Sequence, residues 1–195
     1  MGIMKEFLWV VWRWVRWPVL VLGFLYAVLV GFRTVMLFDE DKTNAAVAEI
    51  HAQKITLADV MGTSLPPAPD QAENDATVAG IDKNNNGIRD DVELAIFKKY
   101  PNDKKTRAAA LQYAMAEQMY LTRVYNTETW KAVAEETGRS FGCILQVHID
   151  NEEIQNLVFN TELRKKERTR VFEFITSHGD APGKPCDVDT STLPN

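Results

Sequence analysis

The residues best suited to chemistry lie in one short stretch, residues 82–93, with the sequence DKNNNGIRDDVE. Carboxylate or amide side chains stand at alternate positions, a glycine stands at the sixth position, and a glutamate stands at the twelfth. Oxygen donors with this spacing suit a hard cation, and a closing glutamate with two oxygens favours Ca²⁺ over the smaller Mg²⁺. The predicted calcium ligands are Asp82, Asn84, Asn86, the backbone carbonyl of Ile88, Asp90 and Glu93.

Each position in this stretch has a physical requirement that its residue meets. The turn at the sixth position needs a backbone of unusual freedom, which Gly87 supplies. Asp90, at the ninth position, is of the type that often binds through a water, and Glu93 can close the site from the first turn of a helix. The alternative is a solvated turn, rich in Asn and Asp, that caps the following helix without a metal.

These residues resemble the calcium loop of the EF-hand superfamily, in particular its extracellular bacterial loop–helix variants and the related loops of thrombospondin type-3 repeats. The resemblance covers residues 82–93 and the helix that follows them. Two features depart from a full EF-hand: residues 74–81 do not have the pattern of an entering helix, and Arg89 stands where paired loops carry an apolar residue. No second loop is found, which argues against cooperative sensing. The resemblance implies a single structural Ca²⁺ site with a dissociation constant of roughly 10⁻⁴–10⁻³ M.

An apolar segment near the N-terminus, residues 17–38, predicts a transmembrane helix. As a helix it covers roughly 30 Å, the thickness of the hydrocarbon core of a bilayer. Arg33 lies near one end, where its long side chain can reach the headgroups. Pro18 suits a helix start, and residues 7–17 mix tryptophan with arginine, a combination typical of the membrane interface.

The charges that flank this segment predict its orientation. Basic residues precede it within residues 1–16 and acidic residues follow it at 39–41, so we expect a cytoplasmic N-terminus and an extracytoplasmic C-terminal domain. A cleaved signal peptide is the alternative, but the small-x-small cleavage pattern is missing. A buried core helix would have to cover four tryptophans and two arginines. We therefore expect an uncleaved, single-pass anchor in the cell membrane, with the lipid bilayer as its partner.

The rest of the chain is predicted to be mainly α-helical. Its expected parts are a juxtamembrane helix within 39–61, a proline-rich linker at 62–79, the calcium loop and helical domain at 80–178, and an irregular tail at 179–195. Hydrophobic spacing predicts helices over residues 41–61, 92–100, 104–125, 128–136, 152–159 and 161–177. Gly138 is expected to end the fourth of these, and residues 141–149 fit a helix better than a strand.

The chain contains two cysteines, Cys143 and Cys186. In an oxidising compartment they can form a disulfide that ties the tail to the helical domain, worth about 3–4 kcal/mol in the chain-entropy model. The alternative is a buried free thiol at 143 and an exposed one at 186.

The charge pattern excludes some functions. Residues from Asp39 onward contain 26 acidic and 18 basic side chains, so a nucleic-acid partner is not expected. The most basic stretch, residues 164–170, is interpreted as a solvated helix face. No motif identifies a small-molecule substrate.

The sequence as a whole predicts an N-terminal transmembrane helix followed by a small all-α domain with one calcium loop. The favoured function is a non-enzymatic interaction or envelope-assembly domain, with a possible protein partner on the exported side. One alternative is an envelope enzyme that uses carboxylates such as Glu117, Glu135 and Glu136. Another is a calcium-responsive sensor.

Overall fold

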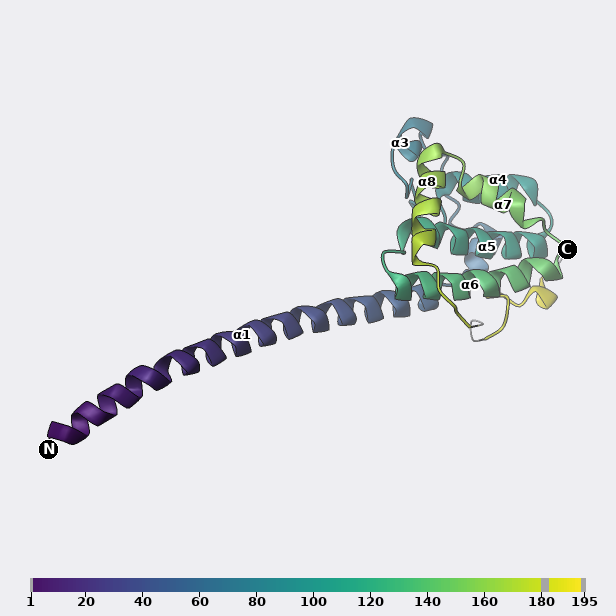
Figure 1. The fold of residues 1–195 in the computed structure, drawn as a ribbon. Coiled ribbons are helices and arrows are strands. Elements are labelled where there is room, and N and C mark those ends of the chain that lie inside the picture. Colours follow the sequence, from purple (N-terminus) through teal and green to yellow (C-terminus); the bar gives the residue numbers. More distant parts are fainter. Residues whose placement is uncertain (1, 180–182, 194–195) are drawn as a thin grey trace. The chain divides into compact units, whose positions relative to one another are not determined.

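The computed structural model describes residues 2–179 and 183–193, and every regular element in this part of the chain is helical (Figure 1). The prediction of a mainly α fold is therefore confirmed. Two compact units are present, Met1–Asn44 and Ala45–Asn195. The elements are α1 (Gly2–Ala52), α2 (Leu57–Met61), α3 (Gln71–Asp75), α4 (Asp90–Lys99), α5 (Lys104–Thr122), α6 (Thr127–Gln146), α7 (Asn151–Val158), α8 (Glu162–Val171) and the short 3₁₀ helices η1 (Phe172–Phe174) and η2 (Thr190–Thr192).

The first unit is the N-terminal part of α1. Within Trp12–Ala52 the helix is long and apolar enough to cross a membrane, and the side chains described in the first unit are largely exposed. Pro18 lies inside α1, so the prediction that it starts the helix is wrong. Proline removes one backbone hydrogen bond, and the apolar, helix-compatible residues on both sides of it allow the helix to continue.

Tryptophan and arginine are paired near the start of α1. The Arg13 guanidinium lies 5.6 Å from the Trp9 ring centroid, and that of Arg16 lies 5.7 Å from Trp17. Within the expected interfacial segment 7–17, the side chains of residues 7, 8, 10 and 11 lie outside the described part of the structure. Pairs of tryptophan and arginine such as these are typical of the lipid headgroup region of a membrane.

A break separates α1 from α2, so the single helix predicted over residues 41–61 is wrong. The Asp59 carboxylate accepts a hydrogen bond from the Thr56 N–H (2.8 Å), and the Thr56 hydroxyl accepts one from the Asp59 N–H (3.3 Å). This capping box requires an extended backbone at Thr56, which starts a new helix. We call residues 53–56 the junction segment.

The region 62–79, expected to be an irregular linker that buries nothing, contains α3. Asp70 caps this helix, and Asn74 within it is completely buried. The Asn74 side-chain carbonyl accepts a hydrogen bond from the backbone N–H of Ile81 at 3.0 Å. The segment is therefore packed through hydrogen bonds as well as through apolar residues such as Val78.

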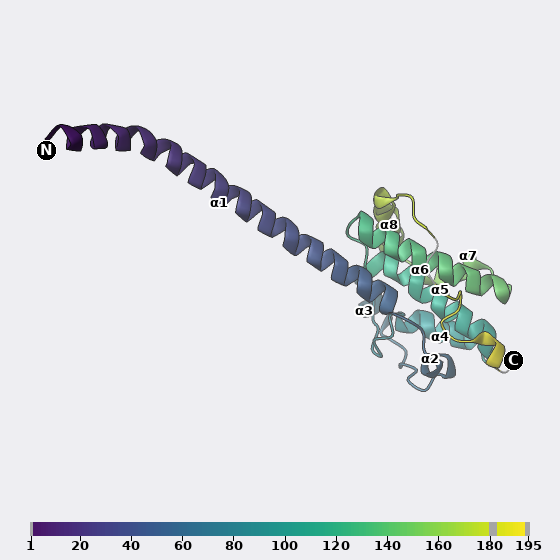
Figure 2. The same ribbon diagram turned by 90° about the horizontal axis from the view of Figure 1, so that it is seen from below.

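The second unit is organised around α5, which contacts α2, α4, α6, α7, α8 and η2. Figures 1 and 2 both show α5 running beside α6, in agreement with their contacts. Its buried alanines, Ala108, Ala109, Ala110 and Ala114, leave room for the neighbouring helices to approach closely. Trp130 of α6 is buried in the same core.

Helix α6 continues to Gln146, so the prediction that Gly138 ends it is wrong. Glycine costs only about 1 kcal/mol inside a helix, and buried residues on both sides of it hold this one in place. Gly142 lies beside Pro185, where a Cβ would come within 3.4 Å of the proline side chain. The segment 141–146 is helical, as expected.

The solvated face predicted for residues 164–170 is wrong at Arg164, whose side chain is completely buried. Its guanidinium pairs with Asp75 (2.8 Å) and donates to the backbone carbonyls of Asn74, Thr77 and Val78. These acceptors satisfy the buried charge, so Arg164 holds the α3 region against α8. In the described part of the tail, η2 is the regular element.

Candidate metal site

The stretch 82–93 forms a closed loop that runs into α4. The backbone N–H of Asp90 donates to the carbonyl of Ile81 at 2.8 Å and brings the two ends of the loop together. Gly87 has φ of +85°, a conformation that favours glycine. A Cβ at this position would also lie 1.6 Å from the side-chain nitrogen of Gln53. Both observations explain why the sixth position is glycine.

The polar side chains of the loop turn back on its own backbone. The two oxygens of Asp82 accept hydrogen bonds from the N–H groups of Asn86 (3.2 Å) and Gly87 (2.9 Å). The side-chain carbonyl of Asn86 accepts one from Ile88 (2.9 Å). This pattern gathers side-chain oxygens on the inside of the loop.

Glu93 closes the arrangement from the first turn of α4. Its side chain is almost completely buried, and its Oε2 accepts a hydrogen bond from the side-chain amide of Asn84 at 3.0 Å. The Asp90 carboxylate accepts one from the backbone N–H of Lys83 at 3.0 Å. The structure thus links the predicted side-chain ligands through one set of local hydrogen bonds. Ile88, whose carbonyl was predicted as a ligand, has its side chain buried in the core.

The three acids predicted as calcium ligands have no cationic partner among the described residues. None of the ion pairs in the described part of the chain includes Asp82, Asp90 or Glu93. Burial raises the pKa of the Glu93 carboxyl to about 7, and the negative charges of Asp59 and Asp90 act in the same direction. Burial also raises the pKa of Asp82. The loop therefore holds negative charge at an unfavourable site.

Two buried atoms in the loop lack hydrogen-bond partners: Oδ2 of Asp90 and Nδ2 of Asn86. An unpaired carboxylate oxygen is costly unless a proton, a water or a cation reaches it. Carboxylate and amide oxygens are ligands for hard cations rather than for zinc or copper. By donor type, the residues present fit Ca²⁺.

The described residues contain no group of three or more His, Cys, Asp or Glu side chains arranged to hold a metal ion. Asp82, Asp90 and Glu93 therefore do not converge as a three-acid site in this structure. Asp82 and Asp90 instead accept hydrogen bonds from backbone N–H groups, and Glu93 accepts one from the Asn84 side chain. Binding of a cation would exchange some of these hydrogen bonds for metal contacts.

Arg89, the residue that departs from paired EF-hand loops, has a structural role. It is completely buried, and its guanidinium donates to the carbonyls of Leu157 (2.9 Å) and Val158 (3.0 Å) at the C-terminal end of α7. It also pairs with Asp91. Arg89 therefore attaches the loop to another helix of the same chain, because it caps carbonyls that α7 leaves free.

Two contacts to the loop come from segments that precede it, and no local pattern in the sequence signals either of them. Gln53 of the junction segment donates from its side chain to the carbonyl of Asn86 at 3.3 Å. Asn84 donates to the carbonyl of Ser64 at 3.1 Å. Contacts of this kind depend on how distant segments meet, which local spacing does not encode.

The carboxylates considered for an enzyme are engaged by other side chains of the domain. Glu117 is buried on α5 and accepts from Gln155 at 3.0 Å, and burial raises its pKa. Glu136 on α6 pairs with Arg139 at 2.7 Å. Glu135 lies 3.6 Å from the His51 ring. Each of these groups is engaged in a structural contact.

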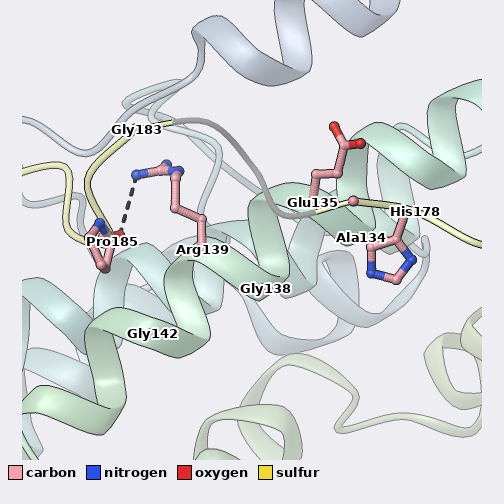
Figure 3. Close-up of a pocket in the computed structure, with 9 residues that line it drawn as sticks. Ala134, Glu135, Gly138, Arg139, Gly142, His178, Gly183 and Pro185 are labelled. Atoms are coloured by element: carbon pink, nitrogen blue, oxygen red, sulfur yellow. Dashed lines mark hydrogen bonds between the residues drawn. The ribbon is translucent and has the colours of Figure 1, made fainter.

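Glu135 also lines a hollow of about 200 Å³ beside α6. Figure 3 shows that the Arg139 side chain in this hollow extends toward Pro185 and away from Glu135 and His178. Arg139 donates to the Pro185 carbonyl at 3.3 Å, and the His178 ring packs edge-on against Trp130. The polar side chains that line this hollow do not converge on one point.

Comparisons of the chain with protein-family models, with curated proteins and with solved structures find no match.

The buried Glu93 predicts a pH dependence of the metal-free protein. Its pKa is higher in the folded chain than in the unfolded one, so the folded state keeps the proton longer and stability falls as pH rises from about 4.5 to 7. In chelator, the free energy of unfolding of Glu93→Gln, measured relative to the wild type, should therefore increase by about 3 kcal/mol between pH 4 and pH 8. Urea unfolding at several pH values measures this difference. A difference that does not change with pH would contradict it.

Proposed function

We propose that the chain is a single-pass membrane protein whose exported helical domain is stabilised by one calcium ion bound in the loop 82–93. The observation that supports this most strongly is a group of three acids in the loop without cationic partners, of which Asp90 and Glu93 are buried. Asp82, Asp90 and Glu93 have no cationic partner among the described residues, and one carboxylate oxygen has no partner at all. A divalent cation would neutralise this charge without a protein cation.

The expected affinity matches an extracytoplasmic site. Three acids in a single loop give a dissociation constant of roughly 10⁻⁴–10⁻³ M, as in extracellular modules. Calcium outside the cytoplasm reaches that range, whereas cytoplasmic calcium does not. When bound, calcium supplies charge neutralisation and fixes the positions of the oxygen donors.

The contacts of the loop support a structural role for calcium. The loop receives Gln53 from the junction segment, contacts Ser64 after α2, and sends Arg89 to the end of α7. Fixing its backbone would stabilise three separate segments at once. Arg89, which replaces the pairing residue of two-loop proteins, argues for a site that acts alone.

The membrane attachment rests on α1, which has a span long and apolar enough for a bilayer. The basic residues before this span and the acidic residues after it support an N-terminus in the cytoplasm and a domain outside. An oxidising exterior also agrees with the Cys143–Cys186 disulfide. The biological role that we propose is a tethered, non-enzymatic domain for interaction or envelope assembly. Its support is that Glu117, Glu136 and Arg139 are engaged in structural contacts.

Thermal unfolding of the full-length chain in detergent micelles tests the calcium site. At 10 mM calcium the ion should add about 1–3 kcal/mol of stability and raise the melting temperature by about 3–10 °C relative to chelator. Glu93→Gln should abolish this increase, because it removes the closing carboxylate. In chelator near pH 8 the variant should be more stable than the wild type, and in calcium the order should reverse.

Glu128→Gln is the matched control, since Glu128 is exposed in the first turn of α6. It should respond to calcium as the wild type does. Equal melting temperatures in calcium and in chelator for the wild type would reduce the loop to a helix-capping turn.

The orientation in the membrane predicts where the C-terminal domain can be reached. Protease added to intact spheroplasts that express the chain should digest residues of Ala45–Asn195 and leave a membrane-embedded N-terminal fragment. If the domain resists protease until the membrane is permeabilised, it lies in the cytoplasm and the proposed orientation is wrong. Intact-mass analysis of the mature chain tests whether the N-terminal segment is cleaved. A mass that lacks the residues before about Asp39 would show that it is.

A further inference from the structure

The C-terminal segment 183–193 is attached to the helical domain at several points close together. Cys186 forms the disulfide with Cys143 of α6. On either side of Cys186, the Pro185 carbonyl accepts a hydrogen bond from the Gln112 side chain (2.8 Å), and the Asp187 N–H donates to the same side chain (2.9 Å). We call residues 184–188 the strap, because they tie α5 to α6.

Asp187 of the strap reaches the junction segment that follows the membrane helix. Its carboxylate accepts a hydrogen bond from the backbone N–H of Ile55 at 2.9 Å and pairs with Arg139 at 2.7 Å. The side chains of Asp187 and Arg139 are only 2% and 6% exposed. Ile55 itself is buried. A buried acid therefore satisfies a backbone N–H in the short non-helical connection between α1 and α2.

The same charge network continues to the end of α1. Arg139 pairs with Glu136 (2.7 Å), which in turn lies 2.9 Å from the His51 ring and 2.8 Å from the Lys54 ammonium. Without Asp187, the buried guanidinium of Arg139 would lose an acceptor and the Ile55 N–H would lose its partner. The strap therefore supports the point where α1 joins the domain.

The two sulfurs of the disulfide differ in access. Cys143 is 1% exposed, whereas Cys186 lines an open hollow of about 250 Å³ together with Gln146, Lys184 and Val188. An external thiolate can reach the Cys186 side of the bond from this hollow while the helices remain folded. Thiol–disulfide exchange requires access to one sulfur only.

We propose that the Cys143–Cys186 disulfide is a redox-controlled lock on the junction between the membrane helix and the helical domain. The reductant is a dithiol, of the class carried by thiol–disulfide oxidoreductases. One of its thiolates attacks the Cys186 sulfur, the bond between the two cysteines breaks, and Cys143 leaves as a thiolate that takes up a proton. The second thiol of the reductant then displaces Cys186, which is also protonated. The protein gains two electrons and two protons, and the reductant becomes a disulfide.

Reduction leaves the strap held by its hydrogen bonds, by the ion pair of Asp187 with Arg139 and by the packing of Val188 against the core. Asp187 then leaves Arg139 and Ile55, and the junction segment opens while the core around α5 stays folded. None of the contacts of the strap involves the loop 82–93, but the junction segment also contacts the loop through Gln53, so the test holds calcium constant.

Hydrogen exchange on the full-length chain in detergent micelles tests the lock, with dithiothreitol as the dithiol and calcium held constant. Alkylation of Cys186 without denaturant should first show that the bond is reduced in the folded protein. In the reduced protein the amide of Ile55 should exchange at least tenfold faster than in the oxidised protein. The amide of Leu111, in the buried part of α5, should keep its protection.

Asp187→Ala with the disulfide intact supplies the second test. It should accelerate exchange at Ile55 as reduction does, and reduction of this variant should add little. Asp189→Ala is the control, because Asp189 is exposed and its carboxylate caps η2 through Ser191.

Three results would overturn the proposal. The Ile55 amide could stay equally protected after reduction, or it could stay protected in Asp187→Ala. Reduction could also remove protection at Leu111 together with that at Ile55, which would make the disulfide a staple of the whole domain rather than a lock on the junction.

Discussion

The structure depends on a concentration of negative charge that the loop 82–93 holds away from water. Asp82, Asp90 and Glu93 come from one short stretch, and no described cation pairs with them. The fold does not release this charge to the surface, because Ile88 anchors the middle of the loop in the core and α4 begins within it. Protons can compensate this charge at low pH, and the calcium ion that we propose would compensate it at neutral pH.

Two buried arginines make the surroundings of the loop rigid. Arg89 leaves the loop to bind the end of α7, and Arg164 of α8 collects the backbone carbonyls around α3. Each guanidinium spreads its donors over several carbonyl oxygens and has a carboxylate nearby, which makes its burial tolerable. The loop is thus joined to α7 directly. Residues 74–78, which lie before the loop, are joined to α8.

Local patterns in the sequence predicted the features that local physics determines. The apolar segment and the helical spacing of the domain belong to this group, and a Cys143–Cys186 bond was favoured from composition. The calcium ligands of the loop stay a prediction. Features set by distant segments could not be predicted. Arg164 is charged and lies in a basic stretch, so only its carbonyl partners, 86 to 90 residues away, explain its burial. Glycine ends many helices, but the packing of α6 against α5 overrides that tendency at Gly138.

Isothermal titration of calcium into the full-length chain, with magnesium in a parallel run, tests the central claim most directly. The account predicts one calcium ion per chain, with half-saturation at roughly 0.1–1 mM. It also predicts much weaker binding of magnesium and no calcium binding by Glu93→Gln. The account would be contradicted if the wild type bound no calcium up to 10 mM, or if the variant bound it as well as the wild type does.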